Sequence, residues 1–342
     1  MGAMTGKIFP ILVLSFWVFG TAAAVHAAAG PANASPFLPT PLSATEPDGS
    51  PKGDKDGPDE NATKNRNIDR AYGAFQRGYY LTALDLALSR AKLGDPAAQT
   101  LVAEIYSDGL GVPRNMEKAA FWYKAAANGG DSAAQLKYAL MLLEGRYVDP
   151  DRDKARELMK AAADSGNPSA EFNYGQMLIS DQPGSEGLKK ALPYMHSSAE
   201  AGIADAQFAL AQIYAYGVGS TEPDLDEARK WMIRAARAGF DTAQLDIAVW
   251  LIDGVGAKPD YDSGFGWMRR AANGGNIMAQ NRIAHLYINA IGTRPDPIEA
   301  AKWYILSRRA GMEDAALDDF FQGLTEEEQK AGIEAANNFH SR

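Results

Sequence analysis

The stretch Gly94-Asp95-Pro96-Ala97-Ala98-Gln99 decides the fold, because the chain returns to it at a nearly constant interval. A glycine followed four residues later by Ala-Gln or Ala-Glu recurs five more times, and a partial copy with Ala315 closes the series. Successive glycines are 36 residues apart, with one step of 37. This period is typical of a helical solenoid. The glycines are Gly94, Gly130, Gly166, Gly202, Gly239, Gly275 and Gly311.

The first part of each period predicts an amphipathic helix. Counted from the Ala of the Ala-Gln pair, positions 0, 4, 7 and 8 are apolar in all six full copies, and they share one face of a helix with 3.6 residues per turn. Position 5 is always small, which lets a neighbouring helix approach closely. The residues at position 5 are Ala103, Ala139, Gly175, Ala211, Ala248 and Ala284.

The second part of each period predicts another helix with a constant start. Its N-cap candidates have short polar side chains that can accept a hydrogen bond from a free N–H of the first turn: Asn115, Asp151, Asp224, Asp260 and Asp296. Their register favours helix caps over an array of metal ligands. Seven residues after the cap comes a bulky side chain, which predicts core between repeats and not a carbohydrate-stacking ladder: Trp122, Leu158, Trp231, Trp267 and Trp303.

The third repeat departs from this pattern. Its turn, residues 181–187, lacks the Gly-x-Gly sequence of the others, and Gly187 stands where the cap is expected. The bulky residue is Tyr194, preceded by Pro193. We expect a looser turn here, or a bend in the stack.

The flanking segments complete the organisation. Residues 1–27 resemble a cleaved signal peptide, with Lys7, an apolar run over 8–20 and small residues before a cut after Ala27. An uncleaved membrane anchor is the alternative. Residues 28–66 hold seven prolines and predict a disordered linker. We interpret 67–96 as an N-terminal half-repeat, 97–311 as six repeats, and 312–342 as capping helices, with Thr325 and Glu328 at capping-box spacing.

The first repeat resembles a known family through two runs. They are Ile105-Tyr106-Ser107-Asp108-Gly109-Leu110-Gly111 and Lys118-Ala119-Ala120-Phe121-Trp122-Tyr123-Lys124-Ala125-Ala126. They look like a Sel-one-like repeat (SLR), a tetratricopeptide-like helical hairpin. The resemblance covers about residues 97–311. It implies an all-α, right-handed αα-superhelix that binds other proteins. Exported bacterial members include envelope regulators and scaffolds, among them a periplasmic inhibitor of exopolysaccharide signalling. The repeat disulfides of β-lactam-binding relatives are absent, because this chain has no cysteine.

Composition narrows the chemistry. A formal net charge of −9 without a basic cluster argues against nucleic acid as a partner. The sequence holds no His-Glu-x-x-His, P-loop or Gly-x-Ser-x-Gly motif. Its four histidines have no acid or nucleophile at a readable spacing. We therefore expect no enzymatic activity, no metal and no cofactor.

The resemblance places the first helix of each repeat on a concave face. Positions 2, 3 and 6 vary there among repeats, so they are our candidates for partner binding: Lys137, Phe172, Asn173, Gln176, Phe208, Gln212, Asp246, Arg282 and His285. Phe172 and Phe208 are the predicted apolar anchors, with Lys137 and Arg282 as charge partners. The alternative is that the two rings complete the packing between repeats.

These observations predict an exported scaffold or regulator, periplasmic or secreted in a bacterium, or held at the membrane if the signal is uncut. Its expected partner is a membrane sensor or an envelope assembly protein, in envelope or exopolysaccharide-related signalling or assembly. A structural role in exopolysaccharide or secretion machinery is a further possibility. The alternative from another class is an envelope protein that binds or hydrolyses cell-wall glycan or β-lactam.

Overall fold

The computed structural model describes residues 70–217 and 222–340. The predicted signal peptide, its cleavage site and the linker lie outside the described residues, as do the start of the half-repeat and part of the turn at 218–221. Within the described residues, every regular element is an α-helix. A helical segment at 70–76 comes first.

The helices then follow in the order that the period predicts. Their bounds are α2 (Tyr80–Ala91), α3 (Pro96–Asp108), α4 (Met116–Asn128), α5 (Ser132–Glu144), α6 (Arg152–Asp164), α7 (Pro168–Asp181), α8 (Ser185–Glu200), α9 (Ala204–Tyr216), α10 (Leu225–Arg237), α11 (Asp241–Asp253), α12 (Tyr261–Asn273), α13 (Ile277–Ile288), α14 (Pro297–Arg309), α15 (Ala315–Gln322) and α16 (Glu326–Asn337).

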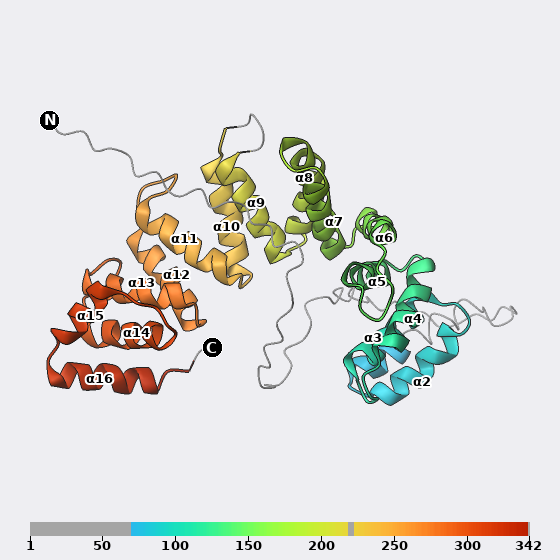
Figure 1. The fold of residues 1–342 in the computed structure, drawn as a ribbon, viewed down its shortest axis with the longest axis horizontal. Coiled ribbons are helices and arrows are strands. Elements are labelled where there is room, and N and C mark those ends of the chain that lie inside the picture. Colours follow the sequence, from blue (N-terminus) through green and yellow to red (C-terminus); the bar gives the residue numbers. More distant parts are fainter. Residues whose placement is uncertain (1–69, 218–221, 341–342) are drawn as a thin grey trace, which may run out of the picture. The chain divides into compact units, whose positions relative to one another are not determined.

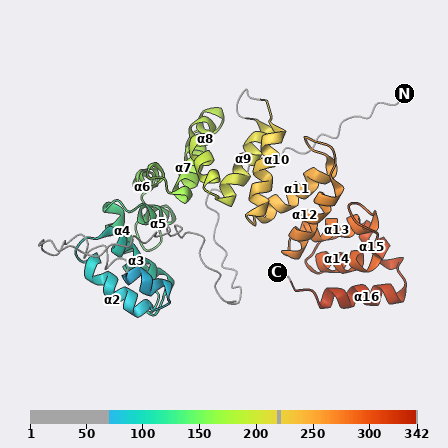
Figure 2. The ribbon, with the colours of Figure 1, turned by 180° about the vertical axis from the view of Figure 1, so that it is seen from behind.

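Helices that are neighbours in sequence are also neighbours in space. Each consecutive pair of helices from α2 and α3 to α13 and α14 packs together, and α16 returns to pack on α14 (Figures 1 and 2). The protein is therefore an all-α solenoid of stacked helical pairs, as the sequence predicts. In such a fold each repeat is stabilised mainly by its two neighbours.

Glycine at the end of each second helix allows the chain to turn. All seven glycines of the series have φ between +76° and +98°, in the left-handed region that side chains with a Cβ rarely adopt. In the second copy, Gly130 N–H donates to the Ala127 carbonyl at 3.1 Å, which satisfies one of the last free carbonyls of α4.

The glutamine of the Ala-Gln pair ties each repeat to the one before it. In five copies its buried Nε2 donates to a backbone carbonyl eight residues earlier, at the end of the preceding second helix: Gln99 to Ala91 (3.0 Å), Gln135 to Ala127 (3.4 Å), Gln207 to Ala199 (3.0 Å), Gln244 to Ala236 (3.1 Å) and Gln280 to Ala272 (3.3 Å). We name these five bonds the glutamine ladder. In the third copy, Glu171 lacks the donor and accepts a hydrogen bond from Ser197 Oγ at 2.7 Å.

The predicted caps of the second helices are confirmed. The side chains of Asn115, Asp151, Asp224, Asp260 and Asp296 each accept at least one backbone N–H of the first turn. The Thr325–Glu328 capping box is also confirmed. Four first helices carry caps that the sequence analysis did not single out: Asp95, Asp131, Asn167 and Asn276.

The bulky position of the second helices is buried to different degrees. Trp303 is 1% exposed and Trp231 is 3% exposed, whereas Trp122 and Trp267 are half-buried. The Trp303 ring also meets Phe339 edge-on, with centroids 5.1 Å apart. Trp231 and Trp303 therefore lie in the core, and the other two lie at its margin.

The expectation of a looser turn in the third repeat is wrong. Helix α7 ends at Asp181 and α8 begins at Ser185, so only residues 182–184 connect them. The corresponding connection between α5 and α6 spans 145–151. The cap is Gly184, with φ +107°, and Gly187 lies inside α8. A Cβ at residue 187 would lie 2.0 Å from the Gln182 carbonyl oxygen, so this close turn requires glycine there.

Candidate functional site on the first helices and in the third repeat

The predicted binding residues lie along α5, α7, α9, α11 and α13, and we call them the first-helix row. Lys137, Gln176 and Arg282 are exposed. The other members are half-buried: Phe172, Asn173, Phe208, Gln212, Asp246 and His285. Each of the five helices thus presents at least one row side chain that solvent reaches in part.

The two phenylalanines of the row also take part in the core. Phe172 and Phe208 pack against the same hydrophobic cluster, which is built around Leu210, Trp231 and Met232. The Phe208 ring lies 4.8 Å from the Phe240 ring, centroid to centroid. Both rings therefore contribute to packing between repeats. Because part of their surface stays open, their role as anchors for a partner stays a prediction.

Arg282 and His285 are brought together at a small cleft of about 140 Å³. Its other lining residues come from α11, α12 and α13: Val249, Ile252, Asp253, Met268 and Leu286. Burial raises the pKa of the neighbouring Asp246 to about 6, and the positive charge of Arg282 opposes that rise. This end of the row is a mixed apolar and charged surface.

His285 also links two elements. Its Nε2 lies 2.8 Å from Asp314 Oδ2, and Asn281 Nδ2 donates to the same oxygen at 3.1 Å. Asp314 caps α15 by accepting from the N–H groups of Ala316 and Leu317. Burial acts to raise the pKa of Asp314, but the hydrogen bonds from His285, Asn281 and Leu317 hold it below its usual value. His285 is therefore engaged in structure as well as placed beside the cleft.

The structure extends the row to Glu104 on α3, which the sequence analysis did not single out. Burial raises its pKa to about 7; the charge of Lys137 lowers it, and Asp108 and Asp131 raise it further. Glu104 stands at position 6 of the first repeat, the same position as Gln176 and His285. Its position within the repeat could therefore have identified Glu104 as a candidate from the sequence alone.

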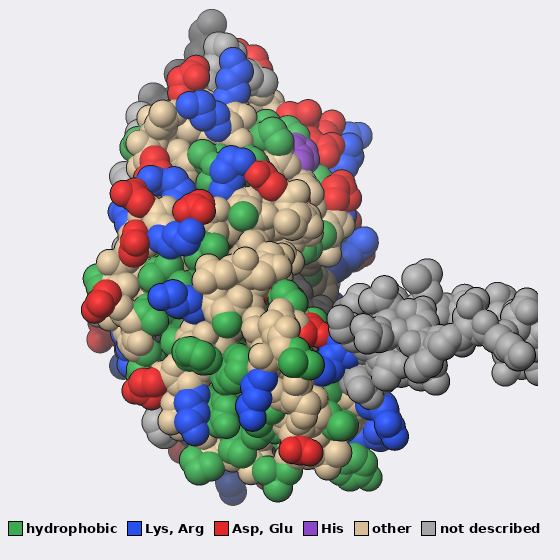
Figure 3. All heavy atoms as spheres, turned by 90° about the vertical axis from the view of Figure 1, so that its right-hand side faces the viewer, with side chains coloured by type: hydrophobic (Ala, Val, Ile, Leu, Met, Phe, Trp, Pro, Cys, Tyr) green, Lys and Arg blue, Asp and Glu red, His purple; other side chains and the backbone are tan. Residues whose placement is uncertain are grey.

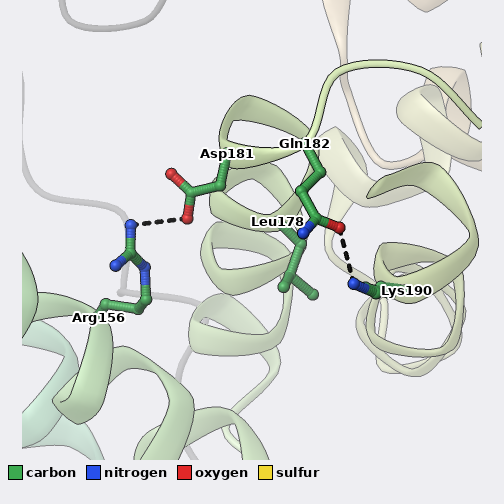
Figure 4. A pocket seen from close by; sticks show the side chains of 5 residues that line it. All are labelled: Arg156, Leu178, Asp181, Gln182 and Lys190. Atoms are coloured by element: carbon green, nitrogen blue, oxygen red, sulfur yellow. Dashed lines mark hydrogen bonds and ion pairs between the residues drawn. The ribbon is translucent and has the colours of Figure 1, made fainter. Parts of the chain in front are cut away.

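A second cleft, of about 410 Å³, lies in the third repeat (Figure 4). Its lining residues come from α6, the end of α7 and α8: Arg156, Leu178, Asp181, Gln182 and Lys190. Asp181 occupies the position at which other first helices end in glycine, such as Gly109 and Gly145. We call this the third-repeat cleft. No residue in it belongs to the predicted site.

Charges of both signs are interspersed on the surface. The face in Figure 3 carries Lys and Arg side chains beside Asp and Glu, with hydrophobic side chains gathered toward its lower part. Over 70–217 and 222–340, no three His, Asp or Glu side chains are grouped to hold a metal ion. Among the helices of the same residues, none is long and apolar enough to cross a membrane.

Comparison with known families accounts for the period. The Sel1 repeat model matches residues 96–131, 132–167, 204–240, 242–276 and 277–312, which together make up more than half of the chain. The chain belongs to the Sel1 repeat family. The predicted SLR resemblance is thus confirmed. The model leaves out 168–203, where α7 and α8 form a helical pair with the unusual turn.

Two crystal structures share the fold. The Sel1 repeat protein from Oxalobacter formigenes is 25% identical, with a TM-score of 0.62 over 71% of this chain and 99% of that one. The protective antigen c5321, present in uropathogenic Escherichia coli strains, displays an SLR fold. It is 24% identical, with a TM-score of 0.51 over 81% of this chain and 69% of that one. Among curated proteins, no sequence matches this chain.

Proposed function

We propose that this Sel1 repeat protein is an exported interaction scaffold or regulator that captures a protein partner on the first-helix row. One observation carries the proposal. Positions 0, 4, 5, 7 and 8 of the first helices stay apolar or small in every repeat, whereas positions 3 and 6 change from repeat to repeat. Position 6 is at least partly open in all six repeats, position 3 in the second to sixth, and position 2 in the third to fifth. Side chains that vary at accessible positions allow a surface to discriminate between partners.

The chemistry of the row suits a protein partner. It combines apolar rings (Phe172, Phe208), amides (Gln176, Gln212) and one exposed cation at each end (Lys137, Arg282). Interfaces combine apolar anchors with a surrounding polar rim in this way. The export, the envelope location and the link to exopolysaccharide-related signalling or assembly rest on the sequence of residues 1–27 and on the family.

The mechanism is binding to a preorganised surface. The glutamine ladder and the helix caps fix the first helices before a partner arrives, so little ordering entropy is lost on binding. Most of the binding free energy then comes from the few side chains that contact the partner.

Crosslinking and affinity capture in the native compartment, followed by mass spectrometry, test the proposal. The variant Lys137→Gln with Arg282→Gln removes both exposed cations of the row. The matched control, Lys124→Gln with Arg237→Gln, removes two exposed cations from the second helices α4 and α10.

We expect one protein to be recovered with the native chain and the control, and to be lost with the row variant. Equal recovery with both variants contradicts the proposal. Retention of all three chains on cell-wall glycan, with no protein recovered, favours the glycan-binding alternative instead.

A further inference from the structure

The third-repeat cleft exists because this repeat departs from the pattern in two ways. Asp181 replaces the glycine that ends other first helices, and only residues 182–184 connect α7 to α8. In the fourth repeat, Arg229 of α10 donates its Nη2 to the carbonyl of Val255, in the glycine turn of the next repeat. Arg156 holds the same register on α6, five residues after its cap, but the glycine turn it would meet is missing. It pairs with the Asp181 carboxylate instead, and the short turn places Lys190 on the opposite wall (Figure 4).

The acceptors in the third-repeat cleft are already engaged. Asp181 is paired at both oxygens: Oδ1 accepts a hydrogen bond from Arg152 Nη2 at 3.1 Å, and Oδ2 forms an ion pair with Arg156 Nη2 at 2.7 Å. Gln182 Oε1 accepts from Lys190 Nζ at 2.7 Å. A ligand that brings only donors would therefore meet oxygens that already have one donor each.

Donors remain in excess. The Nε2 of Gln182 carries two N–H groups, and the ammonium of Lys190 has three N–H groups, of which Gln182 takes one. Arg156 Nε is not among these donors, because it is shielded from solvent, as Arg229 Nε is at the same register of the fourth repeat. The Nη1 of Arg156 also lies 3.4 Å from Asp153, whose side chain is 96% exposed, so water screens that carboxylate. Among the lining residues, the two cations Arg156 and Lys190 face one carboxylate, Asp181, so the cleft has an excess of one positive charge.

We propose that the third-repeat cleft binds the carboxylate of an acidic side chain, Asp or Glu, on the partner protein. A carboxylate is an acceptor-only group with about four lone-pair sites, which matches the spare donors of Gln182 and Lys190, while the charge of Arg156 adds a longer-range attraction. Leu178 lies between the two cations and offers an apolar contact for the methylene groups of the same side chain (Figure 4). This inference rests on the proposed function, because it assigns chemistry to the partner of the scaffold.

The test measures peptide binding to the full chain by NMR of labelled leucine methyl groups, read at Leu178. The probes are acetyl-Gly-Glu-Gly-amide, the same tripeptide with Gln, and inorganic phosphate. The variant is Lys190→Gln, and the control is Lys189→Gln, the exposed neighbour on α8 that does not line the cleft. Lys190 is itself exposed, so its loss leaves the core intact.

We expect the Glu tripeptide to shift the Leu178 signals to saturation and the Gln tripeptide to leave them unchanged. Lys190→Gln should weaken Glu binding about tenfold, because a charge-assisted hydrogen bond is lost, and Lys189→Gln should not. Equal shifts with both tripeptides, or equal weakening in both variants, overturn the proposal. Shifts with phosphate alone also overturn it, because the site would then recognise a free oxyanion.

Affinity capture of the partner distinguishes a failure of the cleft proposal from a failure of the proposed function. If Lys190→Gln keeps the partner while the row variant loses it, the scaffold stands and the cleft proposal fails. Loss of the partner with Lys190→Gln but not with Lys189→Gln supports the cleft proposal.

Discussion

Replacing a single glutamine of the ladder should weaken the junction between two repeats. We choose Gln244→Met, at the junction of the fourth and fifth repeats, because methionine keeps the length and volume of the side chain and removes the donor. The native Nε2 lies 3.1 Å from the Ala236 carbonyl oxygen, and Gln244 is 7% exposed.

The magnitude follows from what happens to that carbonyl. A buried carbonyl left without any partner costs about 1–3 kcal/mol. Ala236 O keeps a second hydrogen bond, from Gly239 N–H at 3.2 Å, so it is not orphaned. The expected loss is therefore the net value of one hydrogen bond, about 1 kcal/mol.

Urea unfolding followed by circular dichroism measures this loss, with Gln176→Met as the matched control. Gln176 is an exposed residue on the first helix α7, and its replacement should change the free energy of unfolding by less than about 0.5 kcal/mol. Because repeats are coupled to their neighbours, Gln244→Met can also split the transition into two steps. Identical unfolding curves for the two variants would refute the role assigned to the ladder.

Three further predictions test other parts of the structure. Burial raises the pKa of Glu104 from 4.5 to about 7. The stability that its protonated form contributes is thus present below pH 4.5 and lost as the pH rises through 7. Glu104→Gln should therefore match the native chain at pH 4 and exceed its unfolding free energy at pH 8 by up to about 3 kcal/mol; an equal difference at both pH values would contradict this. Gly187→Ala places a Cβ against a backbone oxygen, whereas Gly130→Ala meets open space at positive φ. The first should thus cost more than the second, whose cost is about 1–2 kcal/mol, and melting curves that rank them the other way would refute the close turn. Trp303→Ala should cost about 3–5 kcal/mol and Trp122→Ala clearly less, because only Trp303 is fully buried; chemical denaturation giving equal losses would contradict this.

The helical pairs were predictable because their signals are local. An apolar stripe at positions 0, 4, 7 and 8 and a cap such as Asp151 each act within one or two helical turns. The stripe recurs in six copies and the cap in five, so a repeat whose own pattern is weak can be assigned from the others. The order of the helices and the caps of the second helices follow from them.

Two structural features were not predictable from such signals. The glutamine ladder joins a side chain to the carbonyl of the preceding helix, so Gln244 can be interpreted only once both helices are placed. The turn of the third repeat depends on Gly187 passing close to the Gln182 carbonyl, a contact that the missing Gly-x-Gly sequence does not reveal.

The candidate site was predictable only in part. The period identifies which positions face the first-helix side, but it does not say that Phe208 stacks on Phe240 or that His285 binds Asp314. The third-repeat cleft depends on Arg156 meeting Asp181, two residues that lie on different helices. Its two departures from the repeat pattern were visible in the sequence, whereas their meeting in space was not.

Site-specific photo-crosslinking in the native compartment tests the central claim most directly. A photoreactive residue is placed at Gln212 or Arg282 in the first-helix row, and at Lys124 or Arg237 on the second helices. Our account predicts that both row positions crosslink to the same protein and that the second-helix positions do not. Crosslinks to that protein only from Lys124 or Arg237 would contradict it.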